Sequence, residues 1–235
     1  WSIRSHLVVT LCNPQIVTNG LVLCLDAANK DSYPGTGTAW NDLSGNGNNG
    51  ILTNGPTFNS GNGGAIVFDG TNDYGDKANI SLIGNNIPFT ICVFCNILTN
   101  PTNDGGIVLY GRMGTQSEVA GLYYRNSDSY IRFTGWAQNA PDYATGFLKD
   151  FNKWHQLSLV YNGSTTLVYR DSIPDPIGAQ TRSLNITLDT LTFGAAPFNN
   201  SYLNQKISLI QLYNRALTAS EVLQNYKATK SRFGL

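Results

Sequence analysis

The stretch His155–Arg170 reads HQLSLVYNGSTTLVYR. Apolar residues alternate with polar ones up to Tyr161, which is typical of a strand in a sheet that has one buried and one solvent-exposed face. Asn162-Gly163 follows, and an Asn-Gly pair between two such runs favours a tight hairpin turn. A second β-branched run then extends to Arg170. This stretch predicts an antiparallel β-hairpin.

The same rhythm extends along the chain. Short aliphatic and aromatic runs are separated about every ten residues by Gly, Asn, Asp or Pro, which supply turn geometry. The pattern predicts an all-β sandwich. Besides the hairpin, the clear runs are Leu21–Leu25, Ala65–Phe68, Phe89–Ile97, Gly106–Tyr110, Gly121–Tyr124, Tyr130–Thr134, Leu188–Phe193 and Ile207–Tyr213.

One short C-terminal helix interrupts this rhythm. Thr218 and Glu221 have the spacing of a capping box, in which each side chain bonds the other's backbone N–H. We expect the helix to pack on the edge or end of the sandwich. Its buried stripe is predicted to be Leu217, Val222, Leu223 and Tyr226.

Composition excludes several partners. The 235 residues carry 15 Lys+Arg and 15 Asp+Glu, so the net charge is zero. Without a run of basic residues, nucleic acid is not an expected partner. The sequence also lacks the long apolar stretch that a membrane-spanning helix needs. We expect one domain over residues 19–235, preceded by a leader or extra strand over residues 1–18.

The four cysteines are predicted to be buried free thiols. Cys92 and Cys95 fall in one apolar run, where positions i and i+3 face opposite sides of a strand. Neither they nor Cys12 and Cys24 have the spacing of a zinc site.

A loop rich in oxygen donors, Asp42–Gly50, suggests calcium. Carboxylate, hydroxyl and amide oxygens at alternate positions are what this cation prefers. The loop is not an EF-hand, because Thr53 stands where the bidentate glutamate belongs. We expect Asp42 and Asn46 to bind calcium together with a distant carboxylate, Asp69 or Asp73. The alternative is a turn-rich loop stabilised by its own side chains.

Four windows carry a resemblance to a known family: Gly20–Ala27, Trp40–Gly50, Val67–Tyr74 and Tyr213–Val222. In this order they resemble the laminin-G-like jelly-roll domains of the concanavalin A-like lectin/glucanase superfamily, over about residues 19 to 226. The chain looks most similar to versions in virion proteins of tailed phages.

The resemblance implies a jelly-roll sandwich of two antiparallel sheets. Such domains mainly bind glycans or proteins, often with calcium near one rim. It also implies that Asp42, Asn46 and Asp69 match loop positions where some members hold the metal. Gly75-Asp76 departs from the family pattern, in which an apolar residue is common.

The superfamily also contains glycosidases. A retaining mechanism needs two carboxyl groups about 5 Å apart, and the chain has only two glutamates. Glu221 belongs to the helix cap, and Glu118 has no acidic partner at i+2 or i+4. We therefore predict that the protein is not an enzyme, which leaves a glycoside hydrolase as the least favoured interpretation.

A sugar-binding surface needs aromatic rings flanked by planar polar groups. The segment Gly135–Tyr143 is interpreted as a loop that offers both. The alternative is that Tyr124 and Trp136 fill the core. Candidate sugar-binding residues in and near this segment are Trp136, Tyr143, Asn139, Asp142, Tyr123, Arg112 and Arg125.

The sequence thus predicts a lectin-like domain on a virion surface or otherwise extracellular, as a capsid decoration or fibre component. Expected partners are host-surface glycans and other virion proteins. Because single-site sugar binding is weak, we expect an oligomer or a high-copy array. The alternative is a purely structural cement protein of a capsid or tail, with protein partners only.

Overall fold

The predicted hairpin is present. In the computed structural model, β13 (Trp154–Tyr161) pairs antiparallel with β14 (Thr165–Arg170), from Leu157 opposite Arg170 to Tyr161 opposite Thr166. The turn has Gly163 at φ +97°, a conformation that glycine adopts without strain. The structure describes residues 15–82, 84–112, 115–135, 142–187, 190–196 and 201–235.

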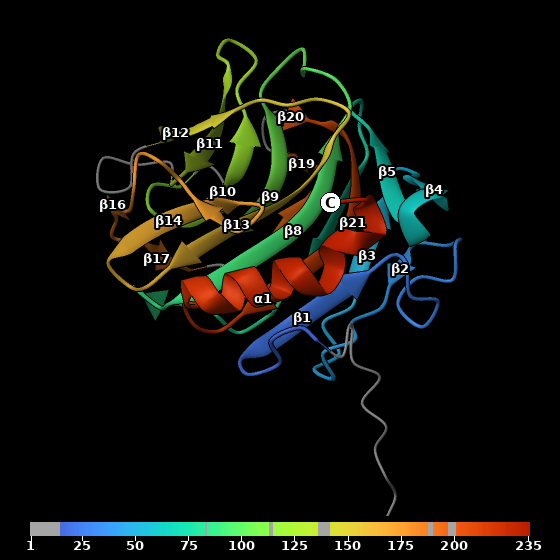
Figure 1. The fold of residues 1–235 in the computed structure, drawn as a ribbon, viewed down its shortest axis with the longest axis horizontal. Coiled ribbons are helices and arrows are strands. Elements are labelled where there is room, and N and C mark those ends of the chain that lie inside the picture. Colours follow the sequence, from blue (N-terminus) through green and yellow to red (C-terminus); the bar gives the residue numbers. More distant parts are fainter. Residues whose placement is uncertain (1–14, 83, 113–114, 136–141, 188–189, 197–200) are drawn as a thin grey trace, which may run out of the picture.

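Two large sheets pack face to face, which confirms the predicted all-β, two-sheet antiparallel sandwich (Figure 1). In spatial order, the nine-stranded sheet holds β15 (Ile173–Pro174), β14, β13, β8 (Phe89–Ile97), β21 (Asn204–Tyr213), β5 (Ala65–Asp69) and β4 (Thr57–Asn59), with β1 (Leu21–Asp26) also paired to β21 and β16 (Gln180–Thr181) to β14.

The eight-stranded sheet forms the other layer. Its order is β12 (Tyr143–Leu148), β11 (Tyr130–Thr134), β10 (Val119–Tyr124), β9 (Gly105–Gly111), β18 (Leu191–Phe193), β6 (Tyr74–Lys77), β3 (Gly50–Thr53) and β2 (Ala39–Trp40). Two short ribbons complete the described strands: β7 (Gly84–Asn85) with β17 (Asn185–Ile186), and β19 (Ala195–Ala196) with β20 (Ser201–Tyr202). The remaining elements are α1 (Ala219–Thr229) and the 3₁₀ turns η1 (Gly61–Gly63) and η3 (Lys230–Phe233).

The core between the sheets is rich in aromatic rings. Phe193 of β18 meets Trp40 and Phe68 edge to face, with ring centroids 5.7 and 6.2 Å apart. Gly75 of β6 lies against the same ring, and a Cβ atom there would come within 2.1 Å of Phe193. This close approach explains why the chain has glycine where the family pattern has an apolar side chain.

Strand β8 is buried on both of its faces. All nine of its residues are buried. Ile91 and Val93 face the core between the sheets, whereas Cys92 and Phe94 face the opposite side. There Cys92 packs with Val222 of α1, and Phe94 stacks on Phe233 of η3 with ring centroids 4.5 Å apart. The C-terminal segment therefore covers the outer face of the nine-stranded sheet (Figure 1).

This position corrects two expectations about the helix. It lies on a sheet face, not at the edge or end of the sandwich, because the apolar side chains of β8 on that face need cover. Leu223, predicted to be buried, is 37% exposed, whereas Val222, Asn225 and Thr229 are buried.

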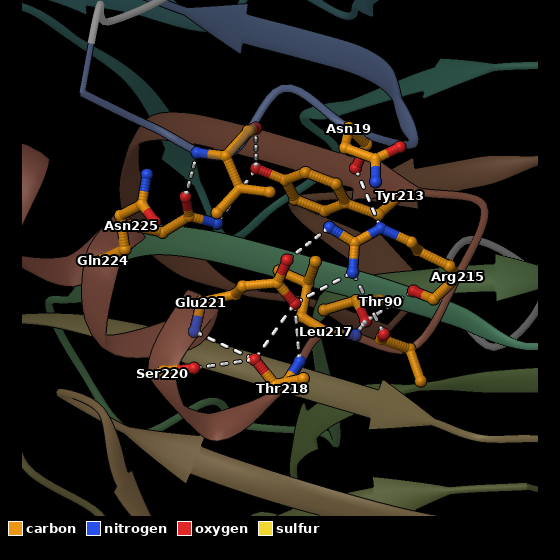
Figure 2. A network of polar contacts seen from close by, with 12 residues as sticks. Asn19, Thr90, Tyr213, Arg215, Leu217, Thr218, Ser220, Glu221, Gln224 and Asn225 are labelled. Carbon is orange, nitrogen blue, oxygen red and sulfur yellow. Dashed lines mark hydrogen bonds and ion pairs between the residues drawn. The ribbon is translucent and has the colours of Figure 1, made fainter.

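The predicted capping box is confirmed. The side chain of Thr218 accepts a hydrogen bond from the N–H of Glu221, and the Glu221 carboxylate accepts one from the N–H of Thr218. Arg215 adds a bidentate pair to the same carboxylate, at 2.9 and 2.7 Å (Figure 2). The Arg215 guanidinium and the Thr218 N–H together lower the pKa of Glu221 to about 2.

A second set of bonds fixes the middle of the helix. Asn225 accepts a hydrogen bond from the N–H of Val17 and donates one to the hydroxyl of Tyr213, which itself donates to the carbonyl of Val17 (Figure 2). Ile16 and Val17 are buried against the helix and sheet. The described end of the predicted leader thus packs onto the domain.

A buried ion pair holds the chain after the helix. Arg232 of η3 donates two hydrogen bonds to Asp26 of β1, at 2.9 and 2.8 Å, and a third to Ser208. The Asp26 side chain is only 3% exposed. A carboxylate buried this deeply depends on its cation.

The cysteine prediction is confirmed in part. Cys92 and Cys95 are free and buried. Cys24, however, is disulfide-bonded, and its partner lies outside the described residues. Among the described helices, none is long and apolar enough to cross a bilayer.

Replacing Arg232 with alanine should lower the free energy of unfolding by about 3 kcal/mol, because it leaves Asp26 buried without its cation. Urea unfolding of both proteins measures this change. The matched control is Arg112→Ala, which removes an arginine that is 52% exposed and 3.4 Å from Glu118. Its expected cost is below about 1 kcal/mol. Equal losses in the two variants would contradict the role given to the buried pair.

Glu221→Gln should lower the free energy of unfolding at neutral pH by about 1–2 kcal/mol, because the carboxylate caps the helix and pairs with Arg215. The folded-state pKa is depressed, so this contribution is complete above the unfolded pKa and is lost as pH falls towards 2. Urea unfolding across this pH range should show the two proteins converging in acid. A difference that does not change with pH would count against this assignment.

Candidate functional site

Three of the predicted sugar-binding residues meet on the outer face of the eight-stranded sheet. Tyr123 of β10 points away from the core, because its neighbours Leu122 and Tyr124 point into it. Its hydroxyl donates to Asp142 Oδ2 at 2.9 Å and accepts from Arg125 Nη2 at 3.1 Å. The second oxygen of Asp142 accepts the N–H of Gly135.

Arg132 of β11 lies directly opposite Tyr123 in the sheet register. Its side chain extends the cluster towards one end of the sandwich. It pairs with Asp128, and Arg125 lies 3.7 Å from Asp104. We call Tyr123, Arg125, Arg132 and Asp142 the Asp142 cluster. Burial and the Asp142 carboxylate raise the pKa of Tyr123, so its hydroxyl stays protonated.

A hollow of about 330 Å³ lies at this end of the sandwich. The connections β8–β9, β10–β11 and β12–β13 form it, and Asp128 joins it to the Asp142 cluster. The residues that line it, which we call the loop-end hollow, are Asn100, Asp128, Ser129, Leu148, Lys149 and Phe151.

Lys149 holds the three connections together. Its ammonium group donates to Asn100 Oδ1 at 3.1 Å, to the carbonyl of Asp128 at 2.6 Å and to the carbonyl of Arg125. Partial burial lowers the pKa of Lys149, and the carboxylate of Asp128 opposes this shift. All three ammonium protons are thus used within the protein. Leu148 is 55% exposed and gives the hollow an apolar wall.

Tyr143 follows Asp142 directly in sequence, but its side chain points to the opposite face of the sheet, because successive side chains alternate along a strand. Its ring stacks on Phe133, with centroids 5.2 Å apart, and the Arg182 guanidinium lies 4.7 Å from its centre. The ring therefore packs against the core, away from the Asp142 carboxylate.

The other predicted sugar-binding residues do not join this site. Arg112 follows β9 and pairs with Glu118 at the opposite end of β10 from Arg125. Six residues of strand separate these ends, about 20 Å. Trp136 and Asn139 lie outside the described residues.

The proposed calcium loop is held together by its own hydrogen bonds. Asp42 Oδ1 accepts the N–H groups of Cys24 and Ser44, and Oδ2 accepts the Ser44 hydroxyl and the N–H of Asn48. These four bonds use the acceptor capacity of a carboxylate. Asn46 donates to the Ser44 hydroxyl and to a backbone carbonyl of β1. The self-stabilised turn, left open from sequence, is what the structure shows.

The distant carboxylates do not approach this loop. Cys24, which contacts Asp42, pairs with Gln211 of β21, whereas Asp69 pairs with Asn204 of the same strand. Seven residues of extended strand place the two sites about 20 Å apart.

The distant carboxylates are also engaged locally. Asp73 Oδ2 accepts the N–H of Asp69, and Asp69 accepts the N–H groups of Thr71 and Asn72. Within the described ranges, no three His, Cys, Asp or Glu residues gather as metal ligands. The predicted set Asp42, Asn46, Asp69 and Asp73 therefore does not fit one calcium ion.

Sequence reasoning missed β12 and the hollow beside it. Tyr143, Thr145 and Phe147 point inward at alternate positions, a period-2 signal that could have extended the interpreted loop into a strand. Leu148 and Lys149 then follow at the strand end. Their contact with Asn100 depends on tertiary structure, and no local sequence pattern predicts it.

Comparison with known proteins identifies the class. Residues 69–223 match the family model of the concanavalin A-like lectin/glucanases superfamily, so the chain belongs to that superfamily. This confirms the fold class expected from the four sequence windows. No curated protein matches the sequence.

Several solved structures share the fold at low sequence identity. A Trypanosoma rangeli sialidase in complex with the inhibitor DANA superposes with a TM-score of 0.70 at 20% identity, covering 93% of this chain and 35% of the sialidase. The binding domain of Paraclostridial Mosquitocidal Protein 1 gives 0.67 at 17% identity, covering 89% of this chain and 52% of that one. The binding domain of botulinum neurotoxin serotype D gives 0.65 at 16%, covering 90% and 52%.

These likenesses overturn the prediction that the protein is not an enzyme. That prediction depended on the missing glutamate pair of one glycosidase mechanism, whereas the similar structures include sialidases. The chain spans about a third of the sialidase's length and about half of each toxin chain, and at these identities the likeness shows the fold alone.

Asp42→Asn should lower the free energy of unfolding by about 1–3 kcal/mol, because an amide cannot accept all four hydrogen bonds. The loss should be the same in excess calcium and in excess EDTA, since the partners of the carboxylate are protein groups. Thermal unfolding in both solutions measures it, with the exposed Asp31→Asn as control. A wild-type melting temperature that rises with calcium, and an Asp42→Asn protein that does not respond, would restore the metal site.

Proposed function

We propose that this domain binds glycans at the loop-end hollow and the adjoining Asp142 cluster. The observation that carries the proposal is the composition of the hollow. Its lining combines two apolar side chains, Leu148 and Phe151, with polar ones that include Asn100 and Ser129. Its volume of about 330 Å³ lies at the small end of the range for ligand sites. Membership of a superfamily of lectins and glucanases supports the same conclusion.

The charges at the site favour a neutral sugar. Arg132 is paired with Asp128, and Arg125 lies between Asp104 and Asp142. Among the described residues of the site, Arg125, Arg132 and Lys149 each have a carboxylate or carbonyl partner, so none of these three cations is left unpaired for an anionic group. Paired side chains of this kind are held in place before a ligand arrives, which lowers the ordering cost of binding.

We further propose that the domain acts on a virion surface, in an extracellular setting. The support is the sequence resemblance to versions in tailed-phage virion proteins. One shallow hollow supplies little affinity, so the proposal includes presentation in several copies, as an oligomer or as part of a high-copy array. Host-surface glycans are the partners that this arrangement would hold.

Contact with other virion proteins is a second candidate role. Exposed apolar side chains gather where the two sheets end: Leu148, Ile173 and Ile177 are 55%, 63% and 53% exposed. Arg170 donates to the carbonyl of Leu148, and its register partner is Ile173, so Leu148 and Ile173 lie close together. An apolar patch at a sheet edge favours a protein contact.

A glycan array probed with the isolated protein tests the main proposal. The wild type should bind a defined set of sugars. Arg125→Ala and Leu148→Ala should weaken binding about tenfold or more, a loss of about 1.4 kcal/mol. Arg112→Ala is the matched control, because that arginine lies at the other end of β10.

Three results would contradict this proposal. Equal binding by all four proteins would move the site elsewhere on the domain. A loss in Arg112→Ala alone would place it at the β9–β10 hairpin. If the wild type binds no sugar on the array, even when it is presented multivalently, the result would favour the protein-contact role.

A further inference from the structure

One aromatic ring stands exposed beside the loop-end hollow. Tyr130 begins β11, and among the described aromatic residues it is the most exposed, at 39%. Its strand neighbours Ile131 and Phe133 belong to the core, so Tyr130 and Arg132 point to the outer face of the eight-stranded sheet. The N–H of Tyr130 donates to Asp128 Oδ1 at 3.0 Å, which fixes its backbone next to a residue that lines the hollow.

Tyr130 has an apolar partner directly across the sheet. Its register partner is Leu148 of β12. Because the preceding Phe147 packs into the core, Leu148 also points outward, and it is 55% exposed. Cross-strand partners have Cβ atoms about 5 Å apart. The two side chains therefore form one apolar surface, which we call the Tyr130 platform, and Leu148 also lines the hollow.

Polar side chains of the Asp142 cluster border the platform. Arg132 lies two residues along the same face of β11, about 7 Å from Tyr130. Tyr123 is directly opposite Arg132 on the next strand. Arg132 bonds Asp128 through Nε, and its guanidinium carries further N–H donors. The platform thus lies between the hollow at the strand ends and polar groups farther along the same sheet face.

This combination of surfaces suits a sugar. A pyranose ring has an apolar C–H face that packs on an aromatic ring, and hydroxyl groups at its rim that bond planar polar side chains. A purely apolar partner would bury the neighbouring arginine and carboxylate groups without giving them new hydrogen bonds, which costs free energy. Because Arg125 and Arg132 already have carboxylate partners, the sugar that fits here is neutral.

The position of the platform determines the size of the ligand. The residues that line the hollow do not include Tyr130. A hollow of about 330 Å³ is small for a ligand site and suits a single sugar unit. A chain that leaves the hollow over Leu148, the residue that both surfaces share, brings its next unit onto Tyr130.

We propose that Tyr130 stacks on the second unit of a neutral oligosaccharide whose first unit occupies the loop-end hollow. This inference rests on the proposed glycan binding, and it adds a contact residue and a minimum length of the ligand. The domain should therefore prefer an oligosaccharide to its single units. Stacking requires the ring of Tyr130 and not its hydroxyl.

Affinities for an oligosaccharide and for its single units test this inference. The probes are the neutral oligosaccharide with the strongest array signal and the methyl glycosides of its monosaccharide units, each titrated into the labelled domain by NMR. The Tyr130→Ala variant should bind the oligosaccharide about tenfold more weakly than the wild type does. Its affinity for the single unit that binds best should be unchanged. Tyr130→Phe, which keeps the ring, should bind both probes like the wild type.

Tyr74→Ala is the matched control. Tyr74 of β6 is half-buried, and it points outward because the adjacent Gly75 lies against Phe193 in the core. It shares the sheet face with Tyr130 but lies four strand spacings away, about 20 Å. The Tyr74→Ala protein should bind both probes like the wild type.

The outcomes separate this inference from the proposed function. Wild-type affinity of Tyr130→Ala for the oligosaccharide would overturn the inference and leave glycan binding at the hollow intact. Equal loss of both probes in that variant would also overturn it, because Tyr130 would then support the hollow itself. If the wild type binds neither probe, both proposals are wrong. Nuclear Overhauser effects between the Tyr130 ring and sugar C–H protons in the wild-type complex decide the matter even if a variant fails to fold.

Discussion

The structure depends on one constraint: strand β8 is apolar on both faces, at the centre of the nine-stranded sheet. One face forms the core between the sheets, and the other needs a cover of its own. The C-terminal segment supplies it, with Val222 of α1 over Cys92 and Phe233 of η3 over Phe94. Polar contacts then fix the cover in place, from the Glu221 cap at its start to the Arg232–Asp26 pair at its end. Without these bonds a large apolar surface of the sheet would face water.

That cover also determines where function can lie. With one sheet face occupied by the helix, the polar Asp142 cluster and the loop-end hollow stand on the opposite sheet and at one end of the sandwich. Lys149 ties three connections there, so the hollow is formed by the fold itself and does not depend on a single mobile loop. Rigid placement of polar groups by a sandwich is what weak sugar recognition requires, because little binding free energy is available to order them.

Local patterns predicted much of the fold and little of the site. The hairpin at Asn162-Gly163 and the Thr218 cap depend on residues close in sequence, and both are confirmed. The position of the helix depends on which face of β8 lacks cover, which no local pattern reveals. Likewise, the sequence offered Arg112 and Arg125 as equivalent sugar-binding candidates. Only the strand pairing shows that they lie at opposite ends of β10, one strand length apart. The donor-rich loop at Asp42 has the composition of a metal site, but its oxygens bond the protein's own N–H and hydroxyl groups.

The most direct test of the account is an NMR titration of the isotopically labelled domain with the sugar that gives the strongest array signal. The account predicts backbone shift changes confined to the connections around Asn100, Asp128 and Lys149 and to the strand ends at Tyr123 and Asp142. Changes centred on Asp42–Gly50 or on α1, or no change at a saturating concentration of sugar, would contradict it.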